Sequence, residues 1–130
     1  RDLMRKVVET GSGKQADAEG YLVGGKTGTA EKAIRGGYKK DAVISTFIGA
    51  FPMDAPRYAV LVMLDEPNGI KATHGYAGAG WTAAPVLGRI VSNIAPILRV
   101  MPRLPANSER KKSQELLVRV NGEGTQLEPL

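Results

Sequence analysis

A short run near the start of the chain, Gly24-Gly25-Lys26-Thr27-Gly28-Thr29, holds the residue types that bind an anionic ligand. Lys26 supplies a positive charge, and the hydroxyls of Thr27 and Thr29 supply hydrogen-bond donors for a carboxylate. The glycines leave side-chain space through which a ligand can approach the main chain. Because the strand-like residues Tyr21-Leu22-Val23 precede the run, we expect it to lie on a strand and to hold a carboxylate-bearing ligand against a backbone edge.

The same stretch satisfies a phosphate-binding pattern, G-x-x-x-x-G-K-[ST], through Gly20 and Gly25-Lys26-Thr27. Such a loop binds phosphate only when a strand precedes its first glycine and a helix follows its lysine. Here residues 12–19 have the composition of a loop, and Tyr21-Leu22-Val23 has that of a strand. Gly28 is also poor in the first turn of a helix. The order of elements is reversed, so we expect no nucleotide to bind.

The composition is that of one small domain with a basic surface. The chain has 130 residues, a net charge of +5, no cysteine and one histidine, so we expect neither a metal nor a cofactor. Two phenylalanines and four tyrosines are too few for base stacking along a basic stripe, and no nucleic-acid partner is expected. No apolar run is long enough to cross a membrane. The sequence begins within a helical pattern and without methionine, so we expect it to be a piece of a longer chain.

Apolar and β-branched runs predict three strands, from Tyr21 to about Ala30, at Ala42–Phe51 and at Tyr58–Leu64. The charged segment Glu31–Asp41 predicts a flexible hairpin connection between the first two strands. No connection is long enough for the crossover helix that parallel strands require, so we expect an antiparallel meander. The second and third strands are apolar on both faces, which is typical of strands that are covered on both sides.

Two helices are predicted beside these strands. Residues 2–10 have apolar side chains at helical spacing and end before two glycines. A second apolar stripe predicts a helix from Thr82 to Ala95, with Thr82 as its cap, Pro85 in its first turn and Pro96 after its end. The predicted fold class is therefore α+β, a three-stranded antiparallel meander with the C-terminal helix packed on one face.

The lysine box in its surroundings, Gly20–Lys32, resembles the class B penicillin-binding proteins, which are serine transpeptidases. Two later segments, Ile44–Pro52 and Gly80–Val86, resemble the cell-division (septal) members of that family. The resemblance covers residues 1–100 as the C-terminal portion of a transpeptidase domain, with a β-lactamase/transpeptidase-like fold, and leaves residues 101–130 as a basic, flexible tail. It implies a peptidoglycan D,D-transpeptidase that binds penicillin and cross-links stem peptides through a serine acyl-enzyme.

The resemblance also implies roles for four residues. Lys26 corresponds to the lysine that raises the local positive potential and contacts the serine of a second family motif. Thr27 and Thr29 correspond to the hydroxyls that bind the carboxylate of D-Ala-D-Ala or of a β-lactam, and Gly28 counts with them as a substrate-binding residue. The backbone N–H of Thr29 would supply half of an oxyanion hole. The implied partners are peptidoglycan stem peptides, β-lactams, the upstream part of the same domain, and cell-division or glycan-polymerase proteins. The implied location of the parent protein is the inner membrane, with the domain facing the periplasm.

The nucleophile of the family is missing from this sequence. The family carries Ser-x-x-Lys and then Ser-x-Asn before the lysine box, whereas Ser108-Glu109-Arg110-Lys111 follows it, in a charged run without the burial that activates a lysine. Ser-x-Asn does not occur. The chain is therefore expected to supply a substrate-binding strand but neither nucleophile nor base. A non-catalytic binding module and a serine β-lactamase fragment remain as alternatives.

Two further residues have structural interpretations. His74 has no second titratable group in its loop, so a role in loop structure is favoured over chemistry. Trp81 is expected to anchor the start of the C-terminal helix in the core rather than to contact a ligand.

Overall fold

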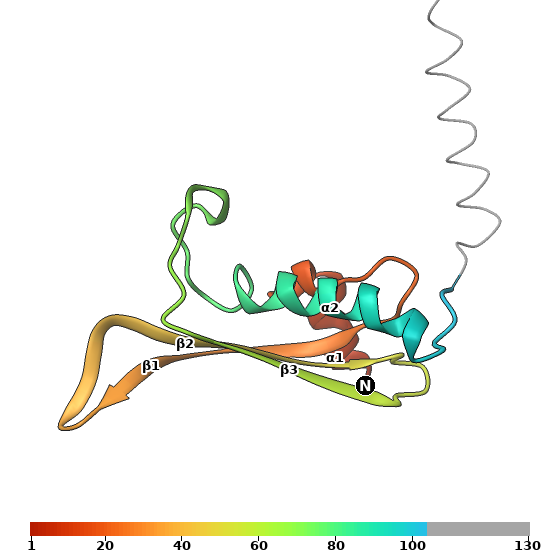
Figure 1. The fold of residues 1–130 in the computed structure, drawn as a ribbon, viewed down its shortest axis with the longest axis horizontal. Helices are drawn as coiled ribbons and strands as arrows, with labels where there is room; N and C mark the ends of the chain where they lie inside the picture. Colours follow the sequence, from red (N-terminus) through yellow and green to blue (C-terminus); the bar gives the residue numbers. More distant parts are fainter. Residues whose placement is uncertain (104–130) are drawn as a thin grey trace, which may run out of the picture.

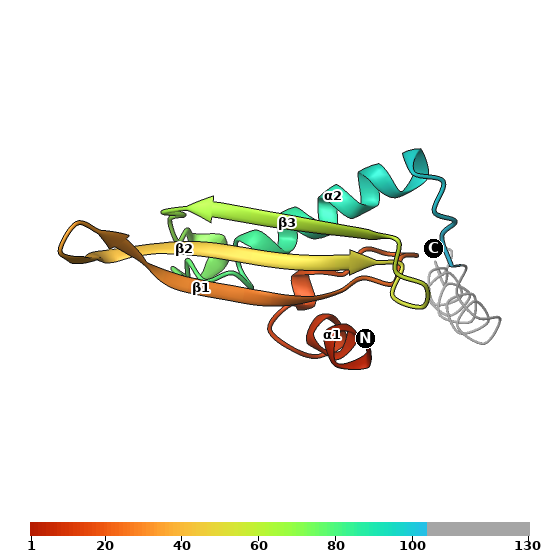
Figure 2. The ribbon, with the colours of Figure 1, turned by 90° about the horizontal axis from the view of Figure 1, so that it is seen from below.

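A three-stranded antiparallel sheet and one long helix dominate the computed structural model, which describes residues 1–103. The strands lie in the order β1 (Gly24–Ile34), β2 (Gly37–Phe51) and β3 (Tyr58–Asp65). Helix α2 (Ala83–Ile97) packs across one face of the sheet, and helix α1 (Asp2–Glu9) flanks β1 (Figures 1 and 2). The predicted α+β class, the antiparallel meander and the first helix are confirmed.

The hairpin between β1 and β2 is longer than the sequence suggests. Both strands continue through the charged segment 31–41, and only Arg35-Gly36 forms the turn, so the predicted flexible connection is wrong. Gly36 takes a φ of 92°, a left-handed conformation that glycine adopts at low cost. The hairpin extends well beyond the part of the sheet that α2 covers (Figure 1).

An ion cluster at the base of this hairpin ties the three strands together. The Lys32 ammonium lies 2.7 Å from a carboxylate oxygen of Asp65 and 2.7 Å from one of Glu66. The Lys39 ammonium lies 2.6 Å from the second oxygen of Glu66. Hydrogen bonds from Lys32 first and from Lys39 second lower the pKa of Glu66 to about 2. These contacts link residues that are far apart in the sequence. Residue-by-residue propensity does not include such contacts, and it therefore underestimates the length of both strands.

Helix α2 also departs from the prediction at both ends. Pro96 lies inside the last turn rather than after it. Thr82 precedes the helix as expected, but its hydroxyl does not cap the helix. It shares a hydrogen bond of 2.6 Å with the buried Ser45 and donates to the carbonyl of Gly78 at 3.0 Å. Thr82 therefore fastens the loop before α2 to strand β2. Pro85 lies in the first turn, as predicted.

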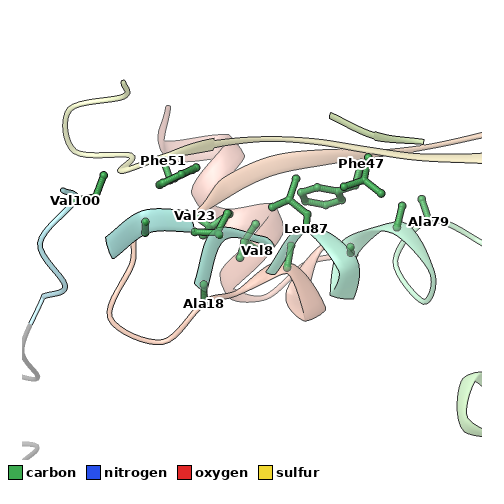
Figure 3. Packing of buried hydrophobic residues seen from close by; sticks show 14 residues of the cluster. Val8, Ala18, Val23, Phe47, Phe51, Ala79, Leu87 and Val100 are labelled. Atoms are coloured by element: carbon green, nitrogen blue, oxygen red, sulfur yellow. The ribbon is translucent and has the colours of Figure 1, made fainter. Parts of the chain in front are cut away.

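The core fills the space between α2 and the sheet. Its largest fully buried side chains come from β2, α2, α1 and the segment before β1, and Figure 3 shows them packed together: Phe47, Phe51, Leu87, Val8 and Val23. Leu87 of α2 lies over Gly49, where an added Cβ would approach its methyl groups to 3.0 Å. The close fit of helix and sheet therefore depends on a glycine in β2.

Helix α2 leaves the opposite face of the sheet exposed. The register places Ile48 opposite Leu61 and Thr46 opposite Met63, so three large apolar side chains lie together on that face. Ile48, Leu61 and Met63 are 50%, 59% and 60% exposed. The predicted apolar character of both strand faces is thus confirmed, and one face is uncovered. Within residues 1–103, no helix has the length and apolar character needed to cross a membrane.

Candidate functional site

Strand β1 is an edge strand, and the lysine box Lys26-Thr27-Gly28-Thr29 lies on it. Successive residues of a strand direct their N–H and C=O groups to opposite edges. The carbonyl of Leu22 accepts from Met53 N–H on the β2 side at 2.8 Å, whereas the carbonyl of Val23 accepts from Arg5 of α1 at 2.7 Å. Continued along β1, this alternation directs the backbone N–H groups of Thr27 and Thr29 to the free edge, where an extended ligand can pair with them.

Three polar side chains meet at Thr27. The Lys26 ammonium donates to the Thr27 carbonyl at 2.8 Å and to the Thr27 hydroxyl at 3.4 Å. The Ser12 hydroxyl shares a hydrogen bond of 3.0 Å with the same Thr27 hydroxyl. Lys26 is exposed, and it reaches around the strand edge from the face opposite α2. One ammonium and two hydroxyls are therefore gathered at the free edge, and together they form a donor set for a carboxylate.

The hydroxyl of Thr29 is held by the loop that precedes α2. It accepts a hydrogen bond of 3.1 Å from Ala79 N–H, which leaves its own proton available for a ligand. A Cβ at Gly80 would collide with the Ser12 carbonyl, so this loop also presses against the segment before β1. A cavity of about 580 Å³ opens between them, lined by Gly11, Ser12, Lys14, Gln15, Thr29, Gly78, Ala79, Gly80 and Trp81.

The glycines of the box have packing roles that the sequence did not suggest. A Cβ at Gly25 would collide with the Phe47 ring and lie 2.5 Å from the Ile48 carbonyl, and one at Gly24 would lie 2.7 Å from the Met53 side chain. Both glycines are buried. They do not clear space for a ligand, because protein side chains fill that space. At Gly28 the nearest atom is the Thr46 hydroxyl, which donates to the Gly28 carbonyl at 3.1 Å.

Trp81 lies at the surface beside the cavity, so the prediction of a core anchor is wrong. It is 39% exposed, stacks on Tyr76 with ring centroids 6.1 Å apart, and meets the edge of His74 at 5.6 Å. Alanines at 79, 83 and 84 occupy the buried positions instead. His74 is exposed, with a left-handed φ of 52°, in the loop before α2. The structure thus groups three aromatic rings near the cavity that Thr29 lines.

The structure brings three of the four predicted site residues, Lys26, Thr27 and Thr29, together at one edge with their polar groups available. It adds Ser12 at that edge and Lys14 in the lining of the neighbouring cavity, and neither residue is predicted from the sequence. The only signal for Ser12 is its position between Gly11 and Gly13, a small hydroxyl residue in a segment with little other side-chain bulk. Its proximity to Thr27 depends on how α1 and the next loop pack against β1, and local sequence does not determine that.

The arrangement can bind and polarise a ligand, but residues 1–103 show no activated nucleophile. Ser45 is buried against Thr82, and Ser92 donates to the Gly88 carbonyl at 3.0 Å. Ser12 contacts the Thr27 hydroxyl. Among the hydrogen bonds of this part of the chain, none joins a serine directly to a lysine or histidine side chain. The motif at Ser108–Lys111 lies outside the described residues.

Comparison with known sequences gives a consistent set of relatives. The family described as "Penicillin binding protein transpeptidase domain" matches residues 1–92. The probable peptidoglycan D,D-transpeptidase FtsI of Caulobacter vibrioides is 44% identical over 118 residues, which cover 82% of this chain and 20% of that protein. Stage V sporulation protein D of Bacillus subtilis is 42% identical over 114 residues, which cover 88% of this chain and 17% of that protein. The chain therefore spans about a fifth of the length of these relatives.

Solved structures agree with the fold. The transpeptidase domain of penicillin-binding protein 3 from Burkholderia pseudomallei is 37% identical, with a TM-score of 0.64 over 78% of this chain and 30% of that one. Penicillin-binding protein 3 from Mycobacterium tuberculosis, solved in complex with ampicillin, is 30% identical, with a TM-score of 0.64 over 80% of this chain and 24% of that one.

Proposed function

The chain belongs to the family of penicillin-binding protein transpeptidase domains, as a C-terminal portion related to the cell-division type, and on that premise we propose what it contributes. It supplies the substrate-binding strand of a peptidoglycan D,D-transpeptidase that cross-links stem peptides through a serine acyl-enzyme. The nucleophile and its lysine come from other residues of the parent domain. In this proposal residues 1–100 belong to the transpeptidase domain and residues 101–130 form a tail.

One observation carries the proposal, namely the donor set at the free edge of β1. The Lys26 ammonium, the hydroxyls of Thr27 and Ser12, and the outward N–H of Thr29 all lie along the edge of β1 that pairs with no other strand within residues 1–103. An extended peptide that ends in a carboxylate can pair with such an edge by β-strand addition. Its carboxylate would lie against the hydroxyls, and the ammonium would add a favourable field.

The proposed chemistry at this edge is electrostatic. When a serine attacks the penultimate carbonyl of the peptide, negative charge develops on the carbonyl oxygen, and the Thr29 N–H is one of the two donors that stabilise it. A single preorganised donor of this kind is worth about 3–4 kcal/mol in a water-excluded site. A β-lactam presents a reactive carbonyl and a carboxylate as well, and we propose that it binds in the same way and is trapped as an acyl-enzyme.

The exposed face of the sheet is a surface on which the upstream part of the same domain can pack. Ile48, Leu61 and Met63 are large apolar side chains that stay at least half exposed on this face, and we propose that the upstream part of the same domain covers them. The parent protein would lie in the inner membrane with this domain in the periplasm, where peptidoglycan is cross-linked. Cell-division and glycan-polymerase proteins are proposed as further partners on the strength of the relatives alone.

The test is the rate at which the intact transpeptidase is acylated by a labelled penicillin. Lys26→Ala and Thr29→Val should slow acylation by about 10- to 1000-fold, because each removes a group that binds or orients the reacting ligand. Thr29→Ser keeps the hydroxyl and should restore most of the rate. Lys40→Ala, which changes an exposed lysine of the hairpin, serves as the matched control. Unchanged rates in both site variants would show that the strand has another role.

Two alternatives are separated by the same experiment. A serine β-lactamase would release hydrolysed penicillin quickly, whereas a transpeptidase keeps the adduct long enough to be isolated. A binding module would form no adduct at all, and the reading frame upstream of Arg1 would then lack Ser-x-x-Lys followed by Ser-x-Asn.

A further inference from the structure

A pocket lined by arginines lies at the end of the sheet where β2 turns into β3, and we propose that it binds an acidic segment of a partner protein. The arginine pocket has a volume of about 270 Å³ and includes Arg57, Arg99 and Arg103 in its lining. The turn and the segment after α2 lie at the same end of the sheet in both views (Figures 1 and 2). Arg99 and Arg103 follow the residues matched by the transpeptidase family.

The backbone holds the arginines of the last segment in place. The helix end is closed by Arg99 N–H on the Pro96 carbonyl at 3.1 Å and by Val100 N–H on the Ala95 carbonyl at 2.9 Å. Arg99 takes a left-handed φ of 54° at the position where helices usually place glycine. Arg103 N–H then donates to the Gly20 carbonyl at 2.7 Å, which ties this segment to the loop before β1.

The charges in the arginine pocket are unbalanced. The Arg103 guanidinium pairs with the Asp54 carboxylate at 2.6 Å, and this hydrogen bond lowers the pKa of Asp54 below its ordinary value. Arg57 donates to the Tyr58 hydroxyl at 3.0 Å and lies over its ring at 5.1 Å, both neutral contacts. Within residues 1–103, neither Arg57 nor Arg99 forms an ion pair. The pocket therefore already binds one internal carboxylate and has two more guanidinium groups for an external one.

The other walls of the pocket favour a polypeptide over a phosphate polymer. Apolar side chains share the lining with the arginines: Tyr21, Leu22, Pro52, Ala55, Val100 and Met101. A peptide can place an acidic residue on the guanidinium groups and a neighbouring apolar residue on these walls. A polyphosphate carries charge at every unit and gains nothing from apolar contact.

The experiment measures fluorescence anisotropy of a labelled octapeptide of alternating leucine and glutamate, titrated with the intact transpeptidase. Binding should weaken by at least about tenfold when glutamine replaces glutamate in the peptide, and by a similar factor in the Arg57→Gln/Arg99→Gly double variant. Glycine suits the left-handed position of residue 99, so Arg99→Gly alone removes a guanidinium while preserving the helix end. This single variant should weaken binding by at least about threefold.

Arg35→Gln, at the hairpin turn, is the matched control and should leave peptide affinity within about twofold. Penicillin acylation should stay unchanged in all these variants, which separates this site from the edge of β1. Equal affinity of the peptide for the double variant and the unaltered protein would overturn the proposal. So would an inorganic polyphosphate that binds through the same arginines while the acidic peptide does not bind.

Discussion

The exposed apolar face of the sheet should have opposite effects in the isolated chain and in the intact transpeptidase. Replacing Ile48, Leu61 and Met63 by threonine should make the isolated chain less prone to associate and the intact transpeptidase less stable. Complete burial of such a side chain contributes about 1.5–3 kcal/mol. Between 50% and 60% of each side chain is still exposed here. Covering that remainder is therefore worth about 0.8–1.8 kcal/mol per residue, and about 2.5–5 kcal/mol for all three.

Two assays measure the association of the isolated chain and the stability of the intact protein. Size-exclusion chromatography with light scattering and calorimetry on the isolated chain should show association or aggregation, which the triple variant reduces. Denaturant unfolding of the intact protein should show the loss of about 2.5–5 kcal/mol in the same variant. Ile34→Thr is the matched control, because Ile34 is 51% exposed on a strand but lies near the hairpin turn. It should change either measurement little.

An isolated chain that is a monomer with a sharp, cooperative melt would contradict this prediction. That result would show a self-sufficient domain whose apolar face needs no cover. An intact protein that tolerates all three substitutions without loss of stability would refute the same point from the other side.

Three more predictions follow from the site and the hairpin. Incubated alone with a labelled penicillin, the 130-residue chain should form no covalent adduct by mass spectrometry, because no serine of residues 1–103 bonds to a lysine side chain and no Ser-x-x-Lys motif precedes the lysine box; a stoichiometric adduct on Ser108 would contradict this. Gly25→Ala should lower the unfolding free energy of the intact protein by about 1–3 kcal/mol in denaturant titrations, because its Cβ would meet a ring and a carbonyl. Gly28→Ala, which meets only a rotatable hydroxyl, should cost less. Glu66 has a folded pKa of about 2, below its ordinary value of 4.5, so its contribution to stability is present above pH 4.5 and is lost as the pH falls toward about 2. NMR titration of its carboxyl group measures this directly, a titration near 4.5 would contradict it, and Glu66→Gln should abolish that part of the pH dependence.

Apolar periodicity predicted the elements whose structure depends on local pattern. The helix near residues 2–10, the order of three antiparallel strands and the helix across them all follow from where apolar side chains recur. The face of the sheet that α2 leaves open was also expected, because strands that are apolar on both sides need two covers.

The features that the sequence did not predict share a physical cause, because each depends on contacts between distant parts of the chain. The charged hairpin forms long strands because Lys32 and Lys39 find carboxylates at the end of β3. Ser12 reaches Thr27 only after α1 has packed against β1. Trp81 stays at the surface because small alanines, not a large ring, fill the space under the start of α2.

The lysine box was recognised from sequence because its residue types are unusual together, but its geometry was only partly foreseen. The hydroxyls and the charge were expected to face a ligand, and the structure places them at a free edge. The glycines were expected to make room for that ligand, whereas Gly24 and Gly25 make room for Met53 and Phe47. A glycine in a strand indicates that another group approaches the backbone closely, but the sequence alone does not identify that group.

The most direct test of the central claim is a crystal structure of the intact transpeptidase acylated by a penicillin. The ligand carboxylate should lie within hydrogen-bonding distance of the Thr27 or Thr29 hydroxyl, and the acyl oxygen should accept a hydrogen bond from the Thr29 N–H. A ligand whose carboxylate lies away from Lys26, Thr27 and Thr29, or whose acyl oxygen points away from β1, would contradict the role proposed for this edge.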